Sequence, residues 1–176
     1  EPARVTIQNS LDEMAKLLRR SLGARVSLVL EHAPEPWPVL VDPGHLGQVF
    51  LNLLVNAAHA IPDERVAEGE IRVYVGTDEK ERAVVRVHDN GAGIAPDVLA
   101  RIFDPFFTTK PASLGTGLGL WICRGIVDHL AGTIEVESAA GRGTTFTVRL
   151  PTSLESTTAP PPPPAGAEPL WHIAEN

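Results

Sequence analysis

Residues 42–61 read DPGHLGQVFLNLLVNAAHAI, and the spacing of their apolar side chains predicts one long helix. Asp42 followed by Pro43 is typical of a helix N-cap and first helical position, and we expect the helix to reach about Ile61. The apolar stripe consists of Leu46, Val49, Phe50, Leu53, Leu54 and Ala57. One face of this helix is therefore expected to pack on a core.

A second face of the same helix is polar, because Gln48, Asn52 and Asn56 follow one another at four-residue spacing. Asparagine is unfavourable inside helices, since its amide competes for backbone hydrogen bonds. Two explanations stay open: a solvated helix face, or a polar strip that lines a ligand pocket. In the second case an amide oxygen would be a hard ligand for Mg²⁺.

Farther along the chain, residues 88–94 read HDNGAGI and directly follow a predicted strand. Asp-Asn-Gly after a strand usually forms a turn. Gly93, however, would also let the backbone approach a ligand closely, and Asp89 would place a carboxylate at the end of the sheet. Such a carboxylate could accept a hydrogen bond from an exocyclic amino group.

Two more segments carry unusual composition. Residues 103–110, FDPFFTTK, hold three of the five phenylalanines, so aromatic rings are expected to pin this loop to the core while it hinges a lid. Residues 115–120, GTGLGL, run into a predicted helix, where backbone N–H groups suit an anion. Neither the P-loop, nor the dinucleotide fingerprint, nor the protein-kinase signatures match this segment.

The rest of the chain alternates helix and strand signals. Val5 and Ile7 predict a short strand, and a capping box of Ser10 and Glu13 opens a helix that Gly23 closes. Further strands are expected at 26–30, 39–41, 71–75 and 83–89, a helix at 118–130, and a closing hairpin at 134–136 and 146–150. This order predicts an α+β fold: a two-layer α/β sandwich with helices on one face of a mixed, largely antiparallel sheet.

The composition excludes several classes of protein. The 176 residues carry a net charge of −7, which argues against nucleic-acid binding, and 43% are hydrophobic, as in globular domains. The single cysteine excludes an intramolecular disulfide, and no apolar run reaches the roughly 20 residues of a membrane span. Five consecutive prolines predict a Pro-rich linker or disordered tail at 152–176, after a domain at 1–151. Because the chain does not begin with Met, we expect a piece of a longer protein. We expect this piece in the cytoplasm, and membrane tethering of the full-length protein stays open.

Together and in this order, the segments resemble the ATP-binding catalytic domain of bacterial sensor histidine kinases, which has the Bergerat fold shared with gyrase, Hsp90 and MutL. Residues 48–58 resemble the N-box, 89–94 the first glycine box, 103–110 the F-box, and 115–120 the second glycine box. Residues 141–146, GRGTTF, are similar to the family's last hairpin. The resemblance covers residues 4 to 151.

The resemblance implies ATP and Mg²⁺ as cofactors. Asn56 would ligate Mg²⁺ and Lys110 would be a lid cation for the γ-phosphate, so both are candidate catalytic residues. Asp89 would accept a hydrogen bond from the adenine amino group, and Thr144 would help to hold a water at the adenine edge. The implied nucleotide-binding residues are Asn52, Asn56, His59, Asp89, Gly91, Gly93, Ile94, Phe107, Thr109, Lys110, Gly115, Thr116, Gly117, Leu118, Gly119 and Thr144. For His59, a solvated helix end stays an alternative to a phosphate contact.

Asn52 stands where the gyrase branch carries a glutamate that activates water. An amide cannot take the proton, so we expect phosphoryl transfer to a partner rather than hydrolysis. None of the six histidines has the helical context, followed by an acidic residue, that the family's phosphoacceptor has. The implied partners are a histidine-containing dimerisation domain, absent from this chain, and a response regulator receiver domain; the isolated chain is expected to be monomeric. An ATP-driven conformational clamp and a degenerate nucleotide-binding regulatory module stay as alternatives.

Overall fold

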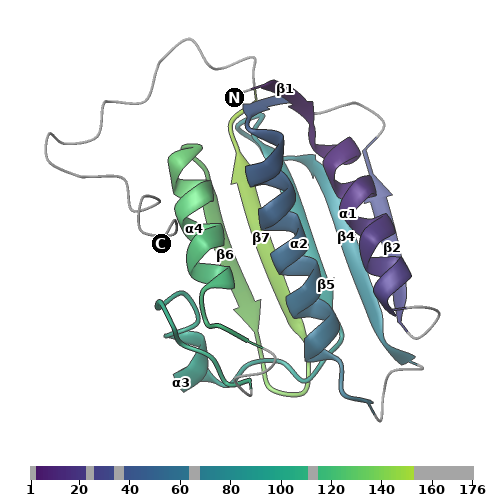
Figure 1. Ribbon diagram of the computed structural model, residues 1–176, viewed down its shortest axis with the longest axis vertical. Helices are drawn as coiled ribbons and strands as arrows, with labels where there is room; N and C mark the ends of the chain where they lie inside the picture. Colours follow the sequence, from purple (N-terminus) through teal and green to yellow (C-terminus); the bar gives the residue numbers. More distant parts are fainter. Residues whose placement is uncertain (1–2, 23–25, 34–37, 64–67, 111–114, 153–176) are drawn as a thin grey trace, which may run out of the picture.

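The computed structural model describes residues 3–22, 26–33, 38–63, 68–110 and 115–152, which form two layers (Figure 1). One layer is a five-stranded sheet of strand order β2-β4-β5-β7-β6, in which β2 and β4 are parallel and the other neighbours antiparallel. Helices α1, α2 and α4 cover one face of this sheet. The predicted sandwich with a mixed, largely antiparallel sheet is therefore confirmed.

The elements follow in chain order as β1 Ala3–Thr6, α1 Ile7–Leu22, β2 Ser27–His32, β3 Pro38–Val41, α2 Pro43–Ala60, β4 Glu70–Thr77, β5 Ala83–Asp89, α3 Pro96–Leu99, α4 Gly119–His129, β6 Thr133–Ser138 and β7 Thr144–Leu150. Strands β1 and β3 form a separate antiparallel pair. Gly23 and all of the predicted tail except Thr152 lie outside the described residues.

Helix α2 lies between α1 and α4 and forms the centre of the core (Figure 1). The Gly44 N–H donates to the Asp42 carboxylate at 2.9 Å, which confirms the predicted N-cap. All six residues of the predicted apolar stripe are buried, none more than 4% exposed. Each large side chain of this kind contributes about 1.5–3 kcal/mol on burial, so the stripe holds α2 against the sheet. The polar face of α2 is thereby fixed as well.

Helix α1 begins at Ile7, so two predictions about its start are wrong. Ile7 belongs to the helix rather than to a strand, and Ser10 lies inside the helix, where it cannot cap it. The reason is tertiary: Ile7, Leu11 and Ala15 are spaced four residues apart and each is fully buried, so the extra turn lengthens the buried stripe. The sequence pattern also does not predict α3, because four residues carry almost no periodic signal.

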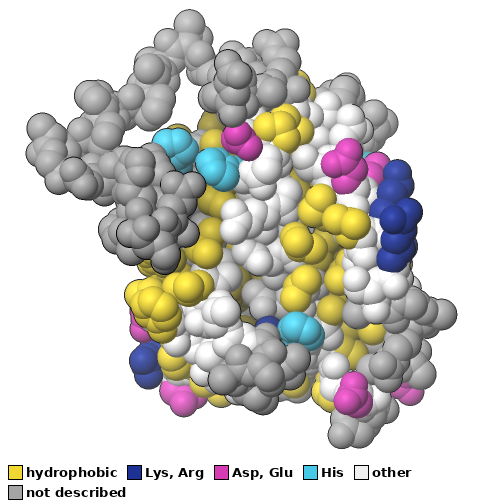
Figure 2. Space-filling model, viewed as in Figure 1, with side chains coloured by type: hydrophobic (Ala, Val, Ile, Leu, Met, Phe, Trp, Pro, Cys, Tyr) yellow, Lys and Arg dark blue, Asp and Glu magenta, His cyan; other side chains and the backbone are white. Residues whose placement is uncertain are grey.

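Among the described residues, no helix is both long enough and apolar enough to cross a membrane. On the face shown in Figure 2, Lys and Arg side chains gather over α1. The net charge is negative, so an anionic ligand bound elsewhere has to be held by local groups.

Candidate functional site

A cavity of about 790 Å³ opens where the last turns of α2 face the loops after β5 and before α4. Most of the predicted nucleotide-binding residues line it: Asn52, Asn56, His59, Asp89, Gly93, Ile94, Phe107, Thr109, Lys110, Gly115, Thr116, Gly117, Gly119 and Thr144. Gly91 and Leu118 are outside this lining. Their backbone N–H groups have partners within the chain: Asp89 Oδ1 at 2.9 Å for Gly91, and Thr116 Oγ1 at 3.3 Å for Leu118.

Part of the lining is apolar and carries no sequence motif. It consists of Val55, Ala92, Ala95, Val98, Ile102, Leu120 and Phe146. Val98 and Ile102 are four residues apart, a spacing that could have marked them as one helical face, although only 96–99 is helical. These side chains give the cavity room for a flat apolar ring beside its polar groups.

Asp89 is the last residue of β5 and is only 2% exposed. Burial raises the pKa of its carboxyl group, while hydrogen bonds from the backbone of Gly91 and Thr144 act in the opposite direction. Thr144 is the register partner of Asp89 on β7. A buried carboxylate that keeps acceptor capacity toward a cavity is suited to recognise an N–H donor.

The hydroxyl of Ser138, which the sequence analysis did not single out, connects three parts of this wall. It accepts from the Ile94 N–H at 2.8 Å and donates to the Gly143 carbonyl at 2.9 Å. Its oxygen also lies 2.9 Å from Thr144 Oγ1. Because Ser138 has only one hydroxyl hydrogen, Thr144 is the donor in this pair, which leaves the lone pairs of its own oxygen available.

The first glycine box is wedged between the end of α2 and the β6–β7 turn. The Ala92 N–H donates to the Ala60 carbonyl at 2.8 Å, and the Gly141 N–H donates to the Ala92 carbonyl at 2.6 Å. Gly93 has φ +70°, and a Cβ at this position would lie 2.0 Å from the Ala139 carbonyl oxygen. The chain itself therefore demands glycine at 93, whether or not a ligand packs there.

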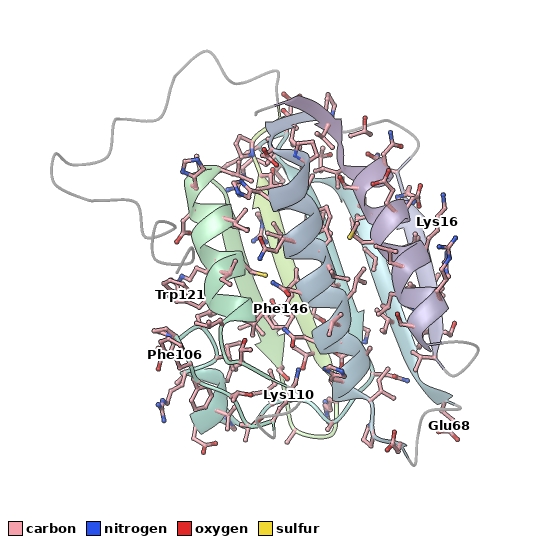
Figure 3. All side chains as sticks on the ribbon, in the orientation of Figure 1. Lys16, Glu68, Phe106, Lys110, Trp121 and Phe146 are labelled. Atoms are coloured by element: carbon pink, nitrogen blue, oxygen red, sulfur yellow. The ribbon has the colours of Figure 1, made fainter. Side chains whose placement is uncertain are left out.

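Another wall of the cavity carries a small cluster of polar groups. The Lys110 ammonium donates to Asn56 Oδ1 at 2.8 Å and lies 3.3 Å from His59 Nδ1. Figure 3 shows Lys110 close to the C-terminal end of α2. Burial lowers the pKa of Lys110, and burial followed by the charge of Lys110 lowers the pKa of His59. A neutral His59 is thus an acceptor for the ammonium, and the amide oxygen of Asn56 already binds a cation.

Phe106 and Gly117, on either side of the segment before α4, approach each other closely. Gly117 has φ +71°, and a Cβ there would lie 2.4 Å from the Phe106 carbonyl carbon, so residues 106 and 117 touch. Phe103 packs edge-on against Phe146, whereas Phe106 is 74% exposed. The predicted pinning by aromatic rings therefore holds for Phe103, which packs against Phe146, and is wrong for Phe106, whose side chain faces solvent. Residues 111–114, between residues 103–110 and the second glycine box, lie outside the described residues.

Asn52 links α2 to α4. Its Nδ2 donates to the Gly119 carbonyl at 3.4 Å, so the side chain braces the start of α4 beside the cavity. Next to it, Cys123 is fully buried, and burial raises the pKa of its thiol to about 11. Such a thiol stays protonated and packs in the core. The described residues hold no group of three His, Cys, Asp or Glu side chains that could bind a metal ion.

Comparison with known proteins agrees with this geometry. The family described as histidine kinase-, DNA gyrase B-, and HSP90-like ATPase matches residues 41–154. The sensor kinase CckA of Brucella abortus (strain 2308) is 37% identical over 177 residues, which cover 95% of this chain and 19% of CckA. The chain thus spans about a fifth of the length of this relative.

Solved structures give the same result. The mycobacterial sensor histidine kinase MprB has a TM-score of 0.75 at 28% identity, covering 86% of this chain and 98% of that one. Full-length ShkA in complex with AMPPNP has a TM-score of 0.72 at 28% identity, covering 86% of this chain and 31% of ShkA. Since the family match covers most of its length, this chain belongs to the histidine kinase-, DNA gyrase B- and HSP90-like ATPases, as an ATP-binding catalytic domain of the sensor histidine kinase type.

Proposed function

We propose that the chain binds Mg·ATP in this cavity and transfers the γ-phosphoryl group to a histidine on a separate dimerisation domain, from which it passes to an aspartate of a response regulator. The observation that carries the proposal is the pairing of a buried carboxylate with a cation-binding amide in one cavity. Asp89 and Asn56 supply these two groups from different elements. The reaction then takes place in the cytoplasm, where ATP is available.

Asp89 is the proposed recognition group for adenine. Its carboxylate accepts a hydrogen bond from the exocyclic amino group, while Thr144 offers an acceptor oxygen to a water at the same edge. The apolar lining, including Val98 and Ile102, packs on the faces of the base. Guanine presents a carbonyl oxygen at the corresponding position, which a buried carboxylate would repel, so the site should favour ATP over GTP.

The donor chemistry of the other wall fits Mg²⁺. Asn56 Oδ1 is an uncharged hard oxygen, the type of ligand that Mg²⁺ uses beside phosphate oxygens, and a cation already contacts it. When bound, the metal ion would neutralise charge on the phosphate oxygens. Lys110 and the backbone N–H groups at the start of α4 would contribute further positive potential there.

The lining supports transfer to a partner rather than to water. Asp89 is the only carboxylate among the described residues that line the cavity, and backbone N–H groups of Gly91 and Thr144 hold it. Asn52, at the position of the gyrase-type glutamate, donates to a carbonyl group and cannot accept a proton. Transfer to an external histidine therefore fits the site better than turnover by an ATP-driven clamp.

The test is labelling with γ-³²P-ATP in the presence of a histidine-containing dimerisation domain of a sensor histidine kinase. We expect acid-labile label on the acceptor domain and little free phosphate when the acceptor domain is left out. Asn56→Ala should abolish the labelling, whereas the matched variant Gln48→Ala, whose side chain is not in the cavity lining, should retain it. Rapid phosphate release by the chain alone would support the clamp instead. Failure of the wild-type chain to bind any nucleotide would support a degenerate module.

A further inference from the structure

We propose that Lys110 occupies the cation position on Asn56 when no nucleotide is bound, and that its exchange for Mg²⁺ makes the site prefer ATP over ADP. This inference rests on the proposed function, because it takes Asn56 as the metal ligand. It adds that the same ammonium group serves the empty and the filled site in turn. Lys110 thereby becomes a residue that determines nucleotide specificity.

The first step is the contact itself. Lys110 Nζ lies 2.8 Å from Asn56 Oδ1 and 3.3 Å from His59 Nδ1, and these two residues are one turn apart on α2. Lys110 is the only Lys or Arg among the described residues that line the cavity. Its backbone is held as well, since its N–H donates to Thr108 Oγ1 at 3.0 Å. Hydrogen bonds of both its side chain and its backbone thus hold Lys110 in the cavity wall.

The second step is competition for one oxygen atom. A Mg²⁺ ligand lies about 2.0–2.1 Å from the ion, so a metal ion on Asn56 Oδ1 would come within a few ångströms of the ammonium. Two cations at such a separation in a partly buried site repel each other strongly. Lys110 therefore has to leave Asn56 Oδ1 before the metal can bind there.

The Lys110 ammonium needs a new acceptor once it has left Asn56. It carries three N–H donors, and its loss of Asn56 is compensated only if another acceptor is close. ATP supplies γ-phosphate oxygens next to the metal, whereas ADP lacks them. Release of Lys110 is consequently compensated better in the ATP complex than in the ADP complex, which has one phosphoryl group fewer to accept from the ammonium. This difference would help the product to leave after transfer.

The experiment measures the dissociation constants of Mg·AMPPNP and Mg·ADP by calorimetry for the wild-type chain, Lys110→Met and the control Lys80→Met. Lys80 lies in the β4–β5 turn, away from the cavity. For Lys110→Met we expect Mg·AMPPNP to bind roughly 10-fold more weakly, because a charge-assisted contact is lost. Mg·ADP should bind roughly threefold to tenfold more tightly, because no ammonium has to be displaced. In EDTA the gain for ADP should disappear, since no metal competes.

A second readout does not need nucleotide. The side-chain amide resonances of Asn56 in the ligand-free chain should shift in Lys110→Met and not in Lys80→Met. Equal weakening of AMPPNP and ADP, or no change in either, would overturn the exchange while leaving the proposed function intact. If the wild-type chain binds neither Mg-nucleotide, the proposed function itself fails, and the exchange fails with it.

Discussion

Replacement of Asp89 by asparagine separates recognition of the base from folding. Asparagine is nearly isosteric with aspartate, and its Oδ1 can keep the hydrogen bonds that the backbone of Gly91 and Thr144 donate. Its Nδ2 would then face the cavity. An N–H donor would stand where the adenine amino group needs an acceptor, so nucleotide binding should be lost although the wall keeps its shape.

The size of the loss follows from the contact. A hydrogen bond to a charged group contributes about 1.5–3 kcal/mol, so Asp89→Asn should weaken Mg·AMPPNP binding by roughly 10-fold to 150-fold. The stability of the Asp89→Asn variant, in contrast, should be unchanged or higher. Burial raises the pKa of Asp89 above its value in the unfolded chain. The ionised carboxylate therefore costs stability as pH rises through the folded-state pKa, and the uncharged amide removes that cost.

Calorimetry and thermal unfolding at neutral pH test both parts on the same samples. Asp128→Asn is the matched control, because Asp128 is an exposed residue near the end of α4. We expect Asp89→Asn to melt at the same temperature as the wild type or higher, while its affinity for nucleotide falls. Affinity within threefold of the wild type would refute the role of Asp89 at the base. A lower melting temperature would refute the argument from burial.

Three further outcomes test the packing and the polar cluster. Gly93→Ala should lower the free energy of unfolding by about 2 kcal/mol or more in a urea titration, because the new Cβ would overlap a carbonyl oxygen of the β6–β7 turn. An unchanged free energy of unfolding would contradict the close approach of Gly93 to that turn. Leu53→Ala should lower the free energy of unfolding by about 2–5 kcal/mol, whereas Leu17→Ala, at a residue 48% exposed, should change it by under about 0.5 kcal/mol. Equal effects of the two substitutions would contradict the burial of Leu53 in the core. Burial and Lys110 lower the pKa of His59, so this residue should reduce stability as pH falls through its unfolded value near 6.5. Lys110→Met should raise that pKa in an NMR titration, and an unchanged value would place the ammonium elsewhere.

The sequence predicts best those elements whose signals are local. The Asp42–Pro43 start of α2 and its apolar stripe lie within 19 residues of sequence, and both agree with the structure. The start of α1 at Ile7 could not be read in the same way. Ser10 and Glu13 form a valid local capping pattern, but burial of Ile7 against the core outweighs it.

In the site, too, features with a local sequence signal could be predicted, whereas contacts between distant residues could not. Asn56 and Asp89 stand out in the sequence because an amide inside a helix and a carboxylate at a strand end are locally unfavourable or unusual. The contact between Asn56 and Lys110 joins residues 54 positions apart, and no pattern in the sequence specifies it. The sequence predicts a ligand contact at Gly93, and the structure adds that a carbonyl group of the neighbouring turn itself requires glycine there. Long-range packing decides both features.

The most direct test of the account is a crystal structure of this chain with Mg²⁺ and AMPPNP. We predict that the adenine amino group lies within hydrogen-bonding distance of the Asp89 carboxylate and that the metal ion lies on Asn56 Oδ1. The Lys110 ammonium should have left that oxygen for a γ-phosphate oxygen. A nucleotide bound outside this cavity, or bound within it without contact to Asp89 and Asn56, would contradict the account.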